Sequence, residues 1–158
     1  MISKLKTMFD KSLDYFSFTL LIVLTLVCFY QVVARYLFSA PPSWSEELAR
    51  YLMIWLTFLG AAIAFRTNAH LGLDFFVGLL PGKGQRWVSW MVGALLLVVL
   101  GLIFSKGFEV AQSMKSQLSP AMRISMAYPY MAVPVGTFLM MFEMIWNLIY
   151  AKPKEEVN

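Results

Sequence analysis

His70 and Asp74 are one pair of residues in this chain whose types and spacing could do chemistry. Four-residue steps on a continuing helix would place both on one face with Arg66, as a proton relay or part of a metal site. One histidine and one carboxylate are too few ligands for zinc, and Gly72 disfavours a continuing helix. Helix termination with a local hydrogen bond is the simpler interpretation, so we predict no metal and no cofactor.

A second group of ionisable residues, Glu46, Glu47 and Arg50, could supply catalytic acids. No nucleophile or histidine accompanies these residues, so we predict no catalytic residue and no enzyme. The group makes better sense as a cluster that faces the membrane surface or another subunit. Trp44 beside it is expected to act as an interfacial anchor.

Glu143 is an acidic residue well inside an apolar segment, and the sequence suggests no partner for it within the chain. Three interpretations are open. The carboxylate lies near the membrane surface and reaches water or Lys152, it contacts another subunit, or it binds an ion. The chain shows no convincing internal repeat of the kind found in secondary transporters, which argues against independent transport.

The composition places these residues in a membrane protein. Of 158 residues, 59% are hydrophobic and only 14% are charged, against roughly half and a quarter in soluble domains. The net charge of +4 comes without a long basic run, which gives no support to nucleic-acid binding. Cys28 is the single cysteine and lies in an apolar run, so an intrachain disulfide is excluded and a packed thiol is expected.

Four apolar segments are long enough to cross a bilayer, and the predicted spans are 15–37, 44–66, 86–113 and 127–151. We therefore predict an all-α integral membrane protein whose residues 1–158 form a single membrane domain. Short amphipathic segments at residues 1–14 and 73–80 are expected to lie in the membrane interface. The first apolar run lacks a small-residue cleavage site and is expected to be a retained span.

The second span is predicted to begin at Ser43, directly after Pro42. Ser43 and Glu46 have the spacing of a capping box, and Glu46 and Arg50 have the spacing of a favourable helical ion pair. Further along, Gly60 and Ala64 form a stripe of small residues where another helix could approach closely. The candidates for a subunit interface are Trp44, Glu46, Glu47, Arg50, Gly60, Ala64, Arg66, His70, Asp74 and Glu143.

The distribution of lysine and arginine predicts the orientation of the spans. Cytoplasmic connections carry an excess of these residues. One side would hold Lys4, Lys6, Lys11, Arg66, Lys83, Arg86, Lys152 and Lys154, and the other Arg35, Arg50, Lys106, Lys115 and Arg123. We therefore expect both termini in the cytoplasm.

Two series of residues in this chain resemble a known family. The first is Trp44, Glu46-Glu47, Arg50-Tyr51, Trp55, Phe58, Gly60-Ala61, Ala64, Arg66, His70, Asp74 and Leu80-Pro81, and the second is Ser119-Pro120-Ala121, Pro129 and Ala132-Val133-Pro134-Val135-Gly136. Over residues 35–143 the chain is similar to the small membrane subunit of tripartite ATP-independent periplasmic (TRAP) transporters, the DctQ-like family. Met122-Arg123-Ile124 departs from the glycine-containing linker expected at that position.

This resemblance implies a function that periodicity alone does not reveal. Subunits of this family pair permanently with a large membrane subunit that carries the substrate and sodium sites and moves like an elevator. A periplasmic binding protein delivers the substrate transiently, typically an organic acid such as a dicarboxylate or a sialic acid. The expected role is a non-catalytic scaffold in the inner membrane of a bacterial cell, in contact with membrane lipids. No nucleic-acid partner is expected.

Two rival functions are retained beside the scaffold. A free-standing small channel or proton-coupled carrier would use Glu143 and His70. A membrane enzyme or assembly factor would act at Glu46 and Glu47 without a large partner.

Overall fold

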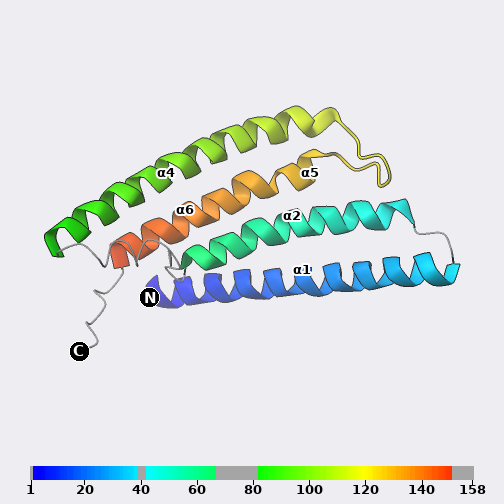
Figure 1. Cartoon of the computed structure of the whole chain (residues 1–158), viewed down its shortest axis with the longest axis horizontal. Helices are drawn as coiled ribbons and strands as arrows, with labels where there is room; N and C mark the ends of the chain where they lie inside the picture. Colours follow the sequence, from blue (N-terminus) through cyan, green and yellow to red (C-terminus); the bar gives the residue numbers. More distant parts are fainter. Residues whose placement is uncertain (1, 39–41, 67–81, 151–158) are drawn as a thin grey trace.

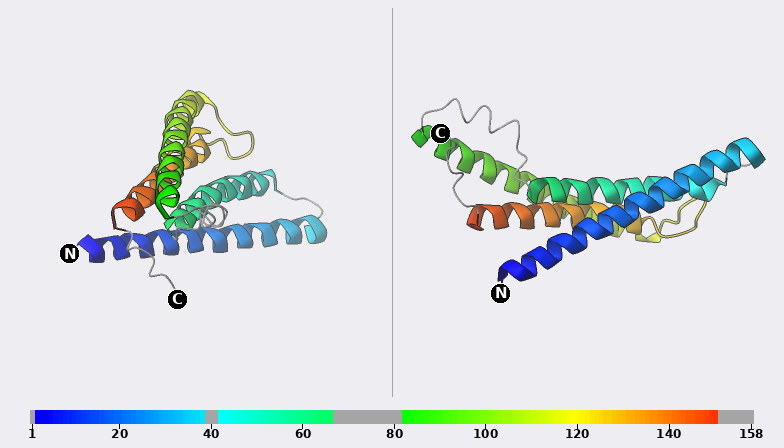
Figure 2. Two further views of the ribbon diagram at one scale, coloured as in Figure 1. Left: turned by 60° about the vertical axis from the view of Figure 1, so that its left-hand side comes forward. Right: turned by 90° about the horizontal axis from the view of Figure 1, so that it is seen from below.

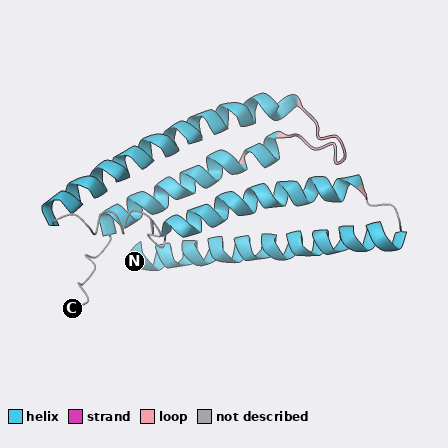
Figure 3. Ribbon diagram, in the orientation of Figure 1, coloured by secondary structure: helices cyan, strands magenta, loops and turns pink. Residues whose placement is uncertain are grey.

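The structure, a computed structural model, describes residues 2–38, 42–66 and 82–150. The elements are α1 (Ile2–Phe38), α2 (Ser43–Arg66), α4 (Gly82–Ser113), the 3-10 turn η1 (Met114–Ser116), α5 (Ala127–Tyr130) and α6 (Ala132–Tyr150). Within these ranges there is no β-strand (Figure 3), and four helices are long and apolar enough to cross a membrane. The predicted all-α membrane fold is confirmed.

The helices lie side by side in one layer, in the order α1, α2, α6 and α4 (Figure 1). Figure 2 shows that α1 runs obliquely to the other helices of this layer. The core lies between α2, α4 and α6, where Ala62, Leu100, Met140 and Met144 are buried together. Outward-facing apolar side chains dominate the remaining surface, as expected for helices that meet lipid or another membrane protein.

Helix α1 is longer than the predicted first span. Its 37 residues extend about 55 Å at 1.5 Å per residue, well beyond the ~30 Å hydrocarbon core. Residues 2–14 are helical as predicted, but they continue into the span without a break instead of forming a separate segment. The hydroxyls of Thr19 and Thr25 donate to the carbonyls of Tyr15 and Leu21 at 2.8 Å, so the apolar part satisfies its own polar groups.

Helix α2 begins at Ser43 as predicted, although the predicted capping box does not form. The carbonyl of Pro42 accepts hydrogen bonds from the backbone N–H and the hydroxyl of Ser45, at 3.1 and 2.8 Å. The Glu46 carboxylate points instead to a neighbouring helix, where it meets Arg35. The Glu46 side chain therefore pairs with α1 and does not close the capping box with Ser43.

The fourth predicted span is divided into α5 and α6 at Met131. Pro134 has no N–H to donate to the carbonyl of Tyr130, and this missing bond accounts for the interruption. Met131 keeps helical backbone angles, with φ −63° and ψ −17°, so the chain continues in nearly the same direction.

Two glycines lie at close contacts between helices of the layer. A Cβ atom on Gly136 of α6 would overlap Phe58 of α2, and one on Gly107 of α4 would lie 2.8 Å from Cγ1 of Val133. By contrast, a Cβ atom on Gly60 would meet nothing within 4 Å, and Ala64 is also exposed. The predicted small-residue stripe thus faces away from the other described helices.

Candidate functional site

The polar contacts gather at the two ends of the helix layer, which we name after one residue each. The Lys6 end contains the start of α1, the end of α2 and the end of α6. The Glu47 end contains the end of α1, the start of α2 and residues 114–126. On the predicted topology, the Lys6 end is cytoplasmic and the Glu47 end is periplasmic.

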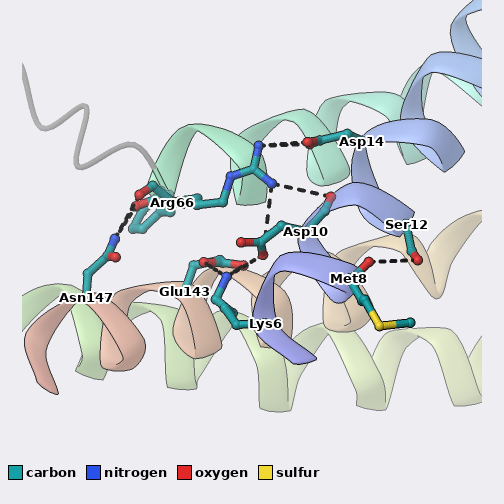
Figure 4. A network of polar contacts seen from close by, with 9 residues as sticks. Lys6, Met8, Asp10, Ser12, Asp14, Arg66, Glu143 and Asn147 are labelled. Atoms are coloured by element: carbon teal, nitrogen blue, oxygen red, sulfur yellow. Dashed lines mark hydrogen bonds and ion pairs between the residues drawn. The ribbon is translucent and has the colours of Figure 1, made fainter. Parts of the chain in front are cut away.

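An ion pair between the first and last helices holds the Lys6 end together (Figure 4). Nζ of Lys6 donates to Oε1 and Oε2 of Glu143 at 2.8 and 2.7 Å. Glu143 is 0% exposed and Lys6 is 8% exposed. Because water hardly reaches this pair, each charge depends on the other for its stabilisation. The expectation that Glu143 lacks a partner in the chain is wrong, while Lys152 lies outside the described residues.

Other groups surround the Lys6 ammonium. It pairs with Asp10 one turn later in α1. Three aromatic rings have centroids 5.9, 5.7 and 5.7 Å from Nζ, those of Phe9, Phe142 and Trp146. A cation at about 6 Å is attracted by the negative face of a ring. Phe9 and Phe142 also meet edge-on at 5.5 Å, which packs the first turns of α1 on α6.

Arg66 joins the end of α2 to the same network. Its guanidinium donates to the carboxylate of Asp14 at 2.8 and 3.1 Å and to the carbonyl of Asp10 at 3.4 Å. Nδ2 of Asn147 in α6 donates to the carbonyls of Phe65 and Arg66 at 3.0 and 3.1 Å. These carbonyls belong to the last turn of α2, where a helix supplies no N–H donor of its own to the backbone carbonyls. Side chains of α1 and α6 therefore fix the end of α2.

Glu47 organises the opposite end. Its Oε2 accepts hydrogen bonds from the backbone N–H groups of Ala121 and Met122 at 2.9 and 2.8 Å. Its Oε1 accepts a hydrogen bond from the hydroxyl of Tyr51 one turn later. A carboxylate with three such donors is held in one orientation. The contact attaches the segment between α4 and α5 to the start of α2.

The segment that Glu47 holds is a tight loop. The N–H of Ser119 donates to the carbonyl of Ile124 at 2.8 Å, and the hydroxyl of Ser119 accepts a hydrogen bond from the N–H of Ile124 at 3.3 Å. Arg123 has a φ of 53°, in the left-handed region that favours glycine. The loop therefore keeps a glycine-like conformation where the sequence departs from the expected glycine-containing linker.

Two further contacts complete the Glu47 end. Arg35 of α1 donates to Glu46 at 3.0 Å, and both side chains are more than half exposed. The rings of Tyr30 and Trp44 stack at a centroid distance of 5.8 Å. The predicted ion pair between Glu46 and Arg50 is absent, because Arg35 takes the Glu46 carboxylate.

A cavity of about 500 Å3 opens beside the start of α2. Its walls come from α2, the tight loop, α5 and the start of α6; they are Ser43, Glu46, Glu47, Arg50, Tyr51, Ile54, Pro120, Ala121, Met126, Pro129, Tyr130 and Val133. Three of the predicted interface residues, Glu46, Glu47 and Arg50, thus line one hollow. The geometry is that of a recess for a ligand or for part of another chain.

The family is decided by comparison with known proteins. The DctQ component of the Tripartite ATP-independent periplasmic transporters matches residues 24–151. The chain belongs to the DctQ family. DctQ is a transport component, so the chain is a transport subunit and not an enzyme.

Relatives of this DctQ chain differ in length. A candidate TRAP transporter small permease protein of Haemophilus influenzae is 30% identical over 149 residues, covering 94% of this chain and 92% of that protein. The sialic acid TRAP transporter small permease protein SiaQ of Vibrio cholerae is 32% identical over 133 residues, covering 82% and 77%. The sialic acid TRAP transporter permease protein SiaT of Haemophilus influenzae is 29% identical over 136 residues, covering 86% of this chain but 22% of that protein.

Not every predicted site residue of this DctQ chain can be placed. His70 and Asp74 lie outside the described residues, and Arg66 lies at the opposite end from Arg50. In the described ranges, no three His, Cys, Asp or Glu side chains come together as metal ligands. Cys28 is exposed on α1, so the expectation that it is a packed thiol is wrong.

Sequence reasoning missed the residues that complete the Lys6 end. Lys6, Asp10 and Asp14 recur at four-residue steps, which places them on one face of a helix. That periodicity was the available signal for a charged face turned toward the bundle. Asn147 gave no comparable signal, because its role depends on where α2 ends.

Proposed function

We propose that this chain is the small, non-catalytic membrane subunit of a TRAP importer and forms a permanent complex with a large permease subunit. The match to SiaT carries this proposal. SiaT is one long permease polypeptide, and about a fifth of it is similar to most of this chain. Two permease parts that a relative carries in one polypeptide are expected to form a complex where they are separate chains.

The shape of the helix layer supports a scaffold role. A layer one helix thick leaves both faces of α2 and α6 accessible over part of their length, and outward side chains such as Met53 and Phe138 are 56% and 57% exposed. The buried charges that the structure describes lie at the Lys6 end and are paired there. This arrangement suits a platform that holds a partner better than a path for ions.

We infer that the transported substrate is an organic acid, delivered by a periplasmic binding protein and imported with sodium. The name of SiaQ, a relative of matching length, specifies sialic acid, which is a carboxylate. Sodium coupling and an elevator-like large subunit follow from the family resemblance. This chain would help to anchor the large subunit in the bilayer, with lipids around its apolar surface. It would make no contact with the substrate.

The membrane orientation follows from the positive-inside rule, with the Lys6 end in the cytoplasm. Labelling with a membrane-impermeant maleimide tests this in a Cys28→Ser background. A cysteine placed at Lys115 should react in intact spheroplasts, whereas one placed at Lys4 should react only after permeabilisation. The reverse pattern would refute the orientation.

Reconstitution tests the function. Proteoliposomes containing this chain, its large subunit and the binding protein should accumulate the organic acid on an inward sodium gradient. Omission of this chain should abolish uptake, and the chain alone should move no solute. Solute flux through the chain alone that Glu143→Gln removes would favour the carrier alternative, but Glu143 is already paired with Lys6, and no observation favours that function.

A further inference from the structure

We propose that Arg50 is a binding site for a carboxylate side chain of the large permease subunit, which enters the cavity at the Glu47 end. This inference rests on the proposed function, because it assumes the permanent complex. It adds the identity of the contact residue and the chemistry of its partner. The cavity, the unpaired guanidinium of Arg50 in it and the hydrogen bonds that fix its loop side carry the proposal.

The described carboxylates of the chain are already engaged. Asp10 and Glu143 meet Lys6, Asp14 meets Arg66, Glu46 meets Arg35, and Glu109 meets Lys106 at 2.7 Å, while Glu47 accepts the loop N–H groups. Arg50 forms no hydrogen bond or ion pair with any described residue. Its guanidinium therefore has five N–H donors available to a partner outside the chain.

The cavity around Arg50 offers hydrogen-bond donors rather than free acceptors. Both carboxylates in its wall are occupied, Glu46 by Arg35 and Glu47 by the loop and Tyr51. The hydroxyls of Ser43 and Tyr130 also line it and can donate. Arg35 balances the charge of Glu46, and Glu47 keeps its charge but directs its oxygens to the loop N–H groups and to Tyr51. Arg50 is the cavity cation that no described carboxylate pairs with, so an entering carboxylate can form its ion pair there.

The size and walls of the cavity favour a protein segment as the occupant. A volume of about 500 Å3 exceeds the space that one small anion needs. Ile54, Pro129 and Val133 supply apolar wall area that a loop or helix end could cover. Glu47 fixes the loop side of the cavity through two backbone hydrogen bonds, so the recess exists before the partner arrives. Charge complementarity thus points to an aspartate or glutamate on a segment of the large subunit.

Carbodiimide coupling in the purified complex tests this contact directly. Arg50→Lys keeps the positive charge and supplies an amine that forms an amide with an adjoining carboxylate, while the carbodiimide takes up the water and becomes a urea. Peptide mapping by mass spectrometry should show a new link from position 50 to an Asp or Glu of the large subunit, absent from the wild-type complex. Arg35→Lys is the matched control and should couple to Glu46, which lies 3.0 Å from Arg35.

Three results would overturn the proposal once the control has coupled. These are no new link from position 50, a link only within this chain, for example to Glu46 or Glu47, or a link only to the binding protein. Retention of the wild-type complex during purification reports separately on the proposed function. A failed inference with an intact complex is therefore distinguishable from a failed complex.

Charge reversal gives a second measurement. Arg50→Glu should lower the affinity for the large subunit by at least about tenfold, because two like charges would face each other. Arg123→Glu is the control, since Arg123 is an exposed cation at the same end but outside the cavity lining. Equal retention of the large subunit by both variants would contradict the proposal. The thermal midpoint of each isolated chain, compared with that of the wild type, checks that both variants fold.

Discussion

The Lys6 end and the Glu47 end are built from opposite types of polar contact. At the Lys6 end, side chains pair with side chains across α1, α2 and α6, and the central pair is almost fully buried. At the Glu47 end, a carboxylate binds backbone N–H groups of a loop, and the ion pair between Arg35 and Glu46 is largely exposed. The first arrangement fixes helices relative to one another, while the second fixes a loop and leaves Arg50 for a partner.

The strongest test of this difference is the removal of Glu143. Glu143→Ala should destabilise the chain by about 3 kcal/mol, the lower end of the range for breaking a buried ion pair, because Asp10 is then the one carboxylate left beside the buried Lys6. Thermal or denaturant unfolding in detergent would measure the loss.

The double variant Lys6→Met with Glu143→Met is the matched control. Removing both charges should restore most of the stability, since a buried ion pair replaced by apolar side chains is often nearly neutral. A single variant as stable as the wild type would show that the Lys6 end is not held by this pair.

A smaller and local effect is expected at the other end. Glu47→Ala leaves the N–H groups of Ala121 and Met122 without their acceptor, so the loop should open more often. Hydrogen exchange at residues 119–124 should accelerate by roughly tenfold, while exchange in α6 stays unchanged. Uniform acceleration across the helices would contradict the view that Glu47 fixes only the loop.

Arg123 provides a test with the opposite sign. Arg123→Gly should stabilise the loop by up to about 1 kcal/mol, because glycine adopts a φ of 53° without the steric cost that other residues bear. A rise in the thermal midpoint checks this, and Arg123→Ala, which retains the Cβ atom, should give no such rise.

The smallest change is expected at the exposed ion pair. Arg35→Gln should alter stability by no more than about 0.5 kcal/mol, since exposed pairs are screened by water and restrict two mobile side chains. A loss comparable to that of Glu143→Ala would remove the distinction between the ends.

The sequence was informative about elements and much less informative about their contacts. Apolar length predicted the four helices that, among the described residues, are long and apolar enough to cross a membrane, and Pro42 marked the start of α2 at Ser43. The partner of Glu143 could not be predicted, because Lys6 lies 137 positions away and local periodicity carries no information across that distance. Local rules failed where a neighbouring helix competed, as when Arg35 took the Glu46 carboxylate from Ser43 and Arg50.

Small residues illustrate the same limit. Gly60 and Ala64 have the spacing of a helix contact, yet the close approaches within the chain occur at Gly107 and Gly136. Spacing shows where a helix surface carries small side chains, but the fold decides which of these surfaces packs against another helix. The exposed stripe on α2 stays a prediction for a partner subunit.

The ion pair between Lys6 and Glu143 also imposes an order on biosynthesis. Lys6 of α1 emerges from the ribosome before its acceptor Glu143, which lies 137 positions later in α6. Until then the ammonium has Asp10 as its acidic neighbour in α1 and cannot take its final place beside α6. Helix α1 can therefore complete its docking only after α6 has been inserted, which makes this contact a late step that a chain truncated before α6 cannot reach.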